Sequence, residues 1–211
     1  RLLGEVPLHS AAHGFRAKHS IVSNATPHVG NAMVVNLDVR NFFPSTSRDL
    51  VWKALRRSVP AGMSDGAFNL LVDVCCYDGA LPVGAPSSPV LANIVLSPVD
   101  AALSKAATRF DLHYTRYADD LTFSGHDDAK RIIPFVAKVL GDYGFVIEPK
   151  KINIFRRGRR QIVTGLVVNE RVNVARYVRR RLRAAVHRRC QGQAPSWHGR
   201  DMGDAELLGR I

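Results

Sequence analysis

Cysteine is scarce in this sequence, and long apolar runs are missing. The 211 residues include three cysteines, and the adjacent pair Cys75 and Cys76 fits neither a disulfide framework nor the spacing of a zinc site. No apolar run approaches the roughly 20 residues that a membrane-spanning helix needs, and no signal peptide is visible after Arg1. These absences argue against a secreted or membrane-embedded protein and predict a reducing cytoplasm.

Acidic residues are nearly absent from one long segment. Residues 150–189 carry fourteen Lys and Arg but a single acid, Glu170, whereas the rest of the chain is close to neutral. The net charge of +12 is therefore concentrated in this segment. Such a segment is typical of a surface that binds phosphate backbones, although a solvated basic helix without a partner would have the same composition.

The hydrophobic pattern predicts an α+β domain. A buried strand is expected over residues 33–38, and a β-hairpin over 112–124 turns at Ala118-Asp119-Asp120. Helices are expected over 47–58, 64–76, 89–107, 127–143 and 175–189, and further strands over 145–147, 152–155, 161–168 and 172–174. This order predicts a mainly antiparallel sheet with helices on one face.

Three acids stand at the ends of the predicted buried strands. Asp119 and Asp120 occupy the hairpin turn, and Asp38 ends the strand over 33–38. An acid in a turn is an ordinary feature on its own. Neighbouring strands would bring the three carboxylates together, where they repel one another unless cations bridge them. Mg²⁺ suits such a site because it takes few carboxylates and completes its shell with water and phosphate oxygens.

Three segments resemble reverse transcriptases. Residues 117–120 (YADD) resemble the metal-binding turn of that family, and residues 37–45 (LDVRNFFPS) resemble the strand that supplies its first metal-binding aspartate in the retron and group II intron branches. Residues 81–93, with LPVGAPSSP and LAN, resemble the loop and helix that cradle template and nucleotide. The resemblance implies a right-hand polymerase palm, with part of the fingers and the start of a basic helical thumb.

Two shorter motifs resemble the retron branch in particular. Residues 24–28 (NATPH) resemble its N-A-x-x-H element, and residues 163–165 (VTG) resemble the element with which retron enzymes are thought to recognise their own structured RNA. The resemblance implies RNA contacts by Asn24, His28, Val163, Thr164 and Gly165.

The sequence also departs from the family pattern. Val83 stands where the family usually has a Gln that helps to hold the template–nucleotide pair, so nucleotide handling differs or another group compensates. Lys18 and His19 stand where the family usually has Gly and Arg. A finger segment whose basic residues contact the triphosphate in the family is not found in this chain, so its activity alone is an open question.

The resemblance implies how the acids and one lysine would act. Asp38 and Asp119 would hold two Mg²⁺ ions, for which Mn²⁺ could substitute, and Asp120 would support one of them. The backbone carbonyl of Val39 would add an oxygen ligand. Lys151 would protonate the leaving pyrophosphate, with Lys150 as the neighbouring alternative, although for both a surface lysine beside a phosphate is an equal alternative.

The resemblance implies contacts to nucleotide and RNA as well. Phe43 would pack under the sugar and exclude a 2′-hydroxyl, whereas Phe42 is expected in the core. The nucleotide would also meet Val83, Gly84 and Ala85, the glycine permitting a close backbone approach. The RNA backbone would meet the arginines at helical spacing near the C-terminus, namely Arg176, Arg179, Arg180 and Arg183.

The expected function is RNA-directed DNA polymerisation of the retron type. Its partners would be an RNA template, a DNA or RNA primer, dNTPs, a cognate non-coding RNA and an effector protein in antiviral defence, in a bacterial cytoplasm. Residues 1–31 would form partial fingers, 32–160 the palm with inserted finger helices, and 161–211 the primer-grip hairpin and start of the thumb. The alternatives are a group II intron-like enzyme, an RNA-binding scaffold with a decayed polymerase fold, and a nucleotidyl cyclase.

Overall fold

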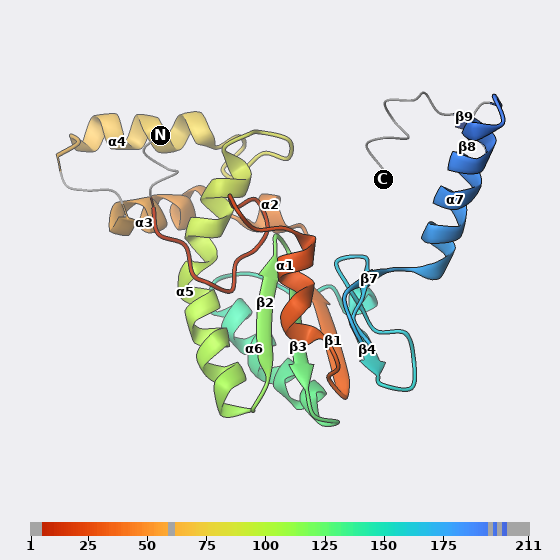
Figure 1. Ribbon diagram of the computed structural model, residues 1–211. Helices are drawn as coiled ribbons and strands as arrows, with labels where there is room; N and C mark the ends of the chain where they lie inside the picture. The colour runs from red at the N-terminus through yellow and green to blue at the C-terminus, as the bar shows by residue number, and fades with distance from the viewer. Residues whose placement is uncertain (1–5, 59–61, 194–195, 198–199, 202–211) are drawn as a thin grey trace.

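A four-stranded antiparallel sheet lies at the centre of the computed structural model in Figure 1, which describes residues 6–58, 62–193, 196–197 and 200–201. The ends of the predicted fingers and thumb segments therefore lie outside the described residues. The strand order is β2-β3-β1-β4, with bounds β1 (Met33–Asp38), β2 (His113–Tyr117), β3 (Asp120–Gly125) and β4 (Asn153–Arg156). Both strands that carry the predicted metal-binding acids, β1 and β3, are thus neighbours inside the sheet.

The helices and the shorter strands complete the fold. The helices are α1 (Ile21–Ala25), α2 (Phe42–Ser45), α3 (Arg48–Ser58), α4 (Asp65–Cys75), α5 (Ser88–Arg109), α6 (Ile133–Gly141) and α7 (Arg176–Cys190). Short 3₁₀ turns are η2 (Thr26–His28), η3 (Ala129–Ile132) and η4 (Pro149–Lys151). The remaining strands are β5 (Ile162–Val163), β6 (Leu166–Val167), β7 (Asn173–Val174), β8 (Ser196–Trp197) and β9 (Arg200–Asp201).

Side-chain alternation along β1 sorts the two faces of the sheet. Met33, Val35 and Leu37 enter the main core, to which α5 and α6 contribute their apolar faces. Val34 points to the opposite face and belongs to a second, smaller core, which it shares with Ala25 of α1 and with the β5–β6 hairpin. The predicted sheet with helices on one face is therefore present, and α1 with the hairpin covers part of the other face.

The helices α3 and α4 form a layer beside the N-terminal half of α5 (Figure 1). Ser64 caps α4 by accepting a hydrogen bond from the backbone N–H of Ala67, as expected for a serine at this position. The ring of Trp52 on α3 meets Phe68 on α4 edge-on, with centroids 5.8 Å apart. The helices predicted over 47–58 and 64–76 are thus confirmed.

The long helix α5 runs through the main core and contributes many of its buried residues. By length and composition it could cross a membrane, but 61% of its most apolar window is buried inside the fold. It also places a fully buried acid, Asp100, against β2. These properties are those of a core helix.

Between residues 127 and 147, the structure differs from two of the predicted elements. The helix expected over 127–143 is shorter than predicted and is divided into η3 and α6, which ends at Gly141. The division falls just before Pro134, which is tolerated in the first turn of a helix but not in its interior. The strand expected over 145–147 is wrong: Ile147 makes one isolated bridge to Val39.

The strand expected over 161–168 is also wrong, because the chain reverses in its middle. Thr164 and Gly165 both have positive φ, 44° and 82°, and connect β5 to β6 as a tight hairpin. A two-residue turn with both residues at positive φ matches the right-handed twist of the flanking strands. A second reversal, between the strands expected over 161–168 and 172–174, joins β6 to β7.

Candidate active site

The three predicted acids meet at one end of the sheet. Asp38 is the last residue of β1 and lies directly opposite Asp120, the first residue of β3. Asp119 occupies the turn between β2 and β3, and its carbonyl accepts a 3.1 Å hydrogen bond from the backbone N–H of Val39. The preceding turn residue, Ala118, is left-handed with φ of 57°. This register brings the ends of two sequence-distant strands together.

Lys151 completes the cluster from η4. Its Nζ donates to both carboxylate oxygens of Asp38, at 2.9 and 3.0 Å. The aspartate side chain is 13% exposed, whereas the lysine is largely open to solvent. The lysine predicted to act near the leaving group therefore lies beside the first acid.

Burial and mutual repulsion raise the pKa values of the two acids of the turn. Burial raises the pKa of Asp119, and the charge of Asp38 adds to this effect. Burial raises the pKa of Asp120 to about 6, assisted by the charges of Asp119 and Asp38. The hydrogen bond and charge of Asp38 raise the pKa of Lys151. The three carboxylates thus hold more negative charge than the one ammonium balances.

This excess charge is what a divalent cation would neutralise. Within the described part of the chain, no three His, Cys, Asp or Glu side chains are gathered into a ready-made metal cage. The ammonium of Lys151 is bound to the Asp38 carboxylate, which would also attract a metal cation. The donor set nevertheless suits Mg²⁺, because that ion takes few carboxylates and draws its other oxygens from water and phosphate.

A pocket of about 360 Å³ opens beside the acids. Its lining includes the charged side chains of Asp38, Asp119 and Lys151 and the apolar side chains of Phe43 and Val83. The residues that complete its lining are Val39, Arg40, Asn41, Phe42, Pro44 and Glu148. A pocket lined by acids, cations and an aromatic ring could accommodate a charged, ring-bearing substrate.

The two adjacent phenylalanines have different positions. Asn41, with φ of 47°, turns the chain after β1 so that Phe42 and Phe43 start the short helix α2. Phe42 is 5% exposed and packs on Phe145, with centroids 6.1 Å apart. Phe43 is half-buried and lines the pocket. The core position expected for Phe42 is confirmed, and the role expected for Phe43 stays a prediction.

The loop that precedes α5 contributes less to this pocket than expected. Val83 lines it and is 75% exposed. Gly84 and Ala85 are not among the lining residues. Gly84 has a φ of 89°, so the conformation of the loop itself favours glycine here.

Two pocket residues, Arg40 and Glu148, were not predicted. Their side chains form an ion pair with 3.3 Å between Arg40 Nε and Glu148 Oε2. Backbone hydrogen bonds hold both beside the acids, with the Glu148 N–H donating to the Asp38 carbonyl at 2.8 Å. Arg40 follows the first acid closely in the sequence, but nothing local to Glu148 indicates that it returns to this site.

A second, polar pocket of about 150 Å³ connects the acids to the hairpin turn. Most of its lining comes from the face of the sheet opposite the main core, and Thr164 of the hairpin turn completes it. Its lining residues are Asn36, Leu37, Asp38, Asp120, Thr122, Lys151, Asn153 and Thr164. Thr164 also donates a 3.3 Å hydrogen bond to the carbonyl of Ile21 in α1. Ala25 of the 24–28 motif and Val163 of the 163–165 motif share the second core, so the two motifs lie together.

The structure corrects the expected roles of Asn24 and His28. Both side chains are fully buried, so neither can reach an RNA base in this fold. The ring nitrogens of His28 pair with Ser124 Oγ at 2.7 Å and with Thr115 Oγ1 at 2.8 Å. This histidine fastens η2 to β2 and β3. Neither amide atom of Asn24 has a hydrogen-bond partner in the described part of the chain.

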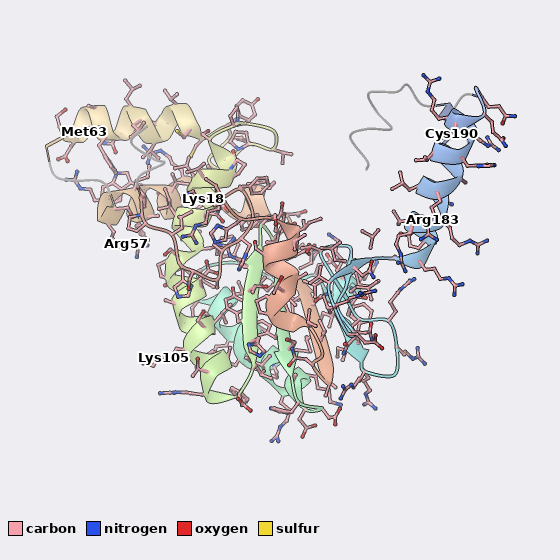
Figure 2. All side chains as sticks on the ribbon, viewed as in Figure 1. Lys18, Arg57, Met63, Lys105, Arg183 and Cys190 are labelled. Carbon is pink, nitrogen blue, oxygen red and sulfur yellow. The ribbon has the colours of Figure 1, made fainter. Side chains whose placement is uncertain are left out.

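The remaining predicted RNA contacts divide by exposure. Val163 is fully buried in the second core, whereas Gly165 is exposed at the turn. Figure 2 shows the side chains of α7, with Arg183 labelled, standing away from the sheet. The arginines expected to meet RNA are all exposed along this helix, namely Arg176, Arg179, Arg180 and Arg183.

Comparison with known proteins identifies the family. The sequence profile of the reverse transcriptase (RNA-dependent DNA polymerase) family matches residues 2–174. The chain belongs to the reverse transcriptase family. Members of this family use a divalent metal cofactor, which agrees with the charge balance of the three acids.

Curated relatives of this chain are bacterial retron enzymes. The Retron Mx162 reverse transcriptase of Myxococcus xanthus is 37% identical over 225 residues, which cover 89% of this chain and 46% of the relative. The Retron Ec86 reverse transcriptase of Escherichia coli is 37% identical over 178 residues, 82% of this chain and 54% of the relative. The predicted resemblance to the retron branch is confirmed, and the chain spans about half the length of these relatives.

Solved structures confirm the palm architecture. The telomerase of Candida albicans, solved with a TWJ fragment of telomeric RNA, aligns with a TM-score of 0.54 at 11% identity, over 70% of this reverse transcriptase and 32% of that chain. An apo telomerase of Candida tropicalis gives 0.55 at 10% identity, over 70% and 36%. At such low identity these likenesses show the fold alone.

Proposed function

We propose that the protein is an RNA-directed DNA polymerase that copies a cognate structured RNA into DNA. The observation that carries the proposal is the register of β1 and β3, which sets Asp38 opposite Asp120, together with a pocket that both Asp38 and Asp119 line. The pocket also offers Lys151 and the ring of Phe43. Acids for metal binding, a proton donor and a steric wall for the sugar are the parts that nucleotide addition needs.

Asp38, Asp119 and Asp120 would hold two divalent ions, Mg²⁺ or Mn²⁺, with the carbonyl of Val39 as a further oxygen. Bound ions would activate the attacking primer hydroxyl and neutralise charge on the phosphates. The carboxylates are preorganised for this, since the strand pairing fixes their spacing before any substrate arrives.

Lys151 holds its proton beside the site where pyrophosphate would leave. Its pKa is raised by Asp38, so the ammonium form is retained at neutral pH. With a cation held by Asp38, the ammonium of Lys151 would be free to donate to a phosphate oxygen. The lysine would thus act as the acid that protonates the leaving group.

Phe43 would select the sugar by shape. Its ring lines the pocket from α2, and it is backed by Phe42, whose centroid is 5.2 Å away. Because the close-packed core supports the Phe43 ring, moving the ring aside would cost substantial free energy. A 2′-hydroxyl would then meet the ring, and dNTPs would be preferred over rNTPs.

RNA binding is proposed for α7 and for the hairpin turn at Thr164-Gly165. The exposed arginines of α7 can pair with backbone phosphates, and the turn lies next to the acids through the second pocket. The retron names of the relatives support a cognate non-coding RNA as the template. We further propose an effector-protein partner, a bacterial cytoplasmic location, and the division into partial fingers (1–31), palm (32–160) and primer grip with thumb (161–211).

The test is incorporation of dTTP on an oligo(dT)-primed poly(rA) template with Mg²⁺ or Mn²⁺. The protein should extend the primer, and Asp119→Asn should abolish extension. Asp127→Asn is the matched control, because Asp127 is exposed beyond the far end of β3. RNA binding without extension under either metal would instead favour a scaffold with a decayed polymerase site.

A further inference from the structure

We propose that Arg116 is a positioning residue, which holds the Asp119–Asp120 turn in its metal-binding conformation from inside the core. The proposal rests on the polymerase function proposed above. Arg116 is fully buried on β2, directly before the Tyr117 to Asp120 turn segment. It is not among the residues that line the two pockets described above, so its action on the acids is indirect.

The guanidinium links the turn to the core helix. Its Nη1 donates to the carbonyl of Ala118, the left-handed residue of the turn, at 2.8 Å. Its Nε and Nη2 donate to the two carboxylate oxygens of Asp100 on α5, at 2.8 and 2.7 Å. Both members of this ion pair are fully buried. The planar fork of arginine suits this arrangement, since it can hold a carboxylate with two donors and a carbonyl with a third.

A second contact fixes the turn from the N-terminal side. The side chain of Asn93 accepts from Arg116 Nη1 at 3.0 Å and donates to the carbonyl of Gly14 at 2.9 Å. The chain before Gly14 runs parallel to β2, with the Arg116 N–H donating to the Ala11 carbonyl at 2.7 Å. A Cβ added to Gly14 would lie 2.5 Å from the backbone nitrogen of Ala118.

The turn therefore depends on these contacts for its shape. A left-handed alanine is disfavoured by its own Cβ, and it persists only where the surroundings determine the conformation. Here the surroundings are a buried cation on its carbonyl and a close-packed glycine against its nitrogen. A small rotation at Ala118 would move both following carboxylates relative to Asp38.

Two variants disturb the turn in independent ways. Arg116→Lys keeps the positive charge but replaces the planar fork by one ammonium, which cannot reproduce the four directed hydrogen bonds of the guanidinium. Gly14→Ala leaves the ion pair intact and pushes on the backbone of Ala118. The matched controls are Gly66→Ala, where a Cβ meets nothing within 4 Å, and Ile132→Ala, a fully buried change beyond the opposite end of the sheet.

The experiment uses the protein expressed from its complete gene. Mn²⁺ affinity is measured by electron paramagnetic resonance without substrate, and kcat, the KM for dTTP and the melting temperature are measured in parallel. Both turn variants should weaken Mn²⁺ binding and lower kcat on the order of 100-fold, the usual effect of about 1 Å of misplacement, with the KM for dTTP nearly unchanged. Ile132→Ala should lower the melting temperature without either change, and Gly66→Ala should behave as wild type.

The outcomes separate the two proposals. If the wild-type protein extends no primer, the proposed function fails, whereas the Mn²⁺ measurement still tests the role of Arg116 because it needs no turnover. If Arg116→Lys and Gly14→Ala weaken Mn²⁺ binding no more than Ile132→Ala does, the positioning role is overturned. Absence of Mn²⁺ binding in every protein overturns it as well.

Discussion

Replacing His28 with glutamine should remove a pH dependence of folding stability. His28 is fully buried, and both ring nitrogens are hydrogen-bonded to hydroxyls of the sheet. Burial, assisted by the charges of His113 and His13, lowers its pKa from 6.5 to about 3. The unfolded chain therefore binds a proton at this residue below about pH 6.5, whereas the folded protein binds it only near pH 3. Stability is lost as the pH falls through this window.

The size of the effect follows from the proton binding of the unfolded state. Between pH 7.5 and pH 5.5, a histidine that protonates only when unfolded costs about 1.4 kcal/mol of stability. The glutamine variant has no such proton. It should be less stable at pH 7.5, by about 1–3 kcal/mol for the disturbed buried hydrogen bonds, and the deficit should shrink by about 1.4 kcal/mol at pH 5.5.

Urea denaturation followed by circular dichroism at the two pH values measures this difference. The control is His187→Gln, because His187 is exposed on α7. Other titrating groups, including Asp120, are present in all three proteins and cancel in the comparison. If the deficit of His28→Gln is the same at both pH values, the buried neutral histidine is refuted.

Three further predictions concern the proposed polymerase activity. Phe43→Val should admit ribonucleotides because the wall against the 2′-hydroxyl is removed, and an unchanged ratio of dNTP to rNTP incorporation would show that another group is the gate. Thr164→Ala with Gly165→Ala should spare extension on poly(rA) but abolish synthesis on the native RNA; a parallel loss of both would indicate a role in the fold or primer grip. Replacing four exposed arginines of α7 by glutamine should reduce the slope of log K for RNA binding against log salt concentration by about 0.7 for each lost phosphate contact. The four are Arg176, Arg179, Arg180 and Arg183. An equal loss of charge at exposed residues outside α7, such as Lys105, should reduce the slope less.

The convergence of the acids could be predicted because each ends an apolar strand. The apolar strands predict the sheet, and the motif acids at the strand ends predict where the carboxylates meet. Arg116 has no such signal, since its partner Asp100 lies on another element and only the packed core shows that their charges are paired. A polar residue inside a helix or strand is usually interpreted as exposed, and long-range pairing reverses that interpretation.

The same limit explains the errors at His28 and at the hairpin. The partners of His28 lie on strands about ninety residues away in the sequence, so no local pattern shows its burial. Residues 161–168 are apolar at both ends, and this hides a reversal that depends on two backbone angles at Thr164 and Gly165. Element type was predictable from periodicity here, whereas turn positions inside short apolar runs were not.

The second core has a consequence for dividing the protein into folding units. Val34 on the central strand packs with Ala25 near the start of the chain and with Val163, Leu166 and Val168 of the hairpin region. A fragment that stops before residue 161 would expose an apolar patch on its central sheet and should aggregate. The helix α7, by contrast, has a small apolar cluster of its own around Ala185. A protease or a designed split would therefore separate the molecule most cleanly between β7 and α7, and the hairpin would remain with the catalytic half.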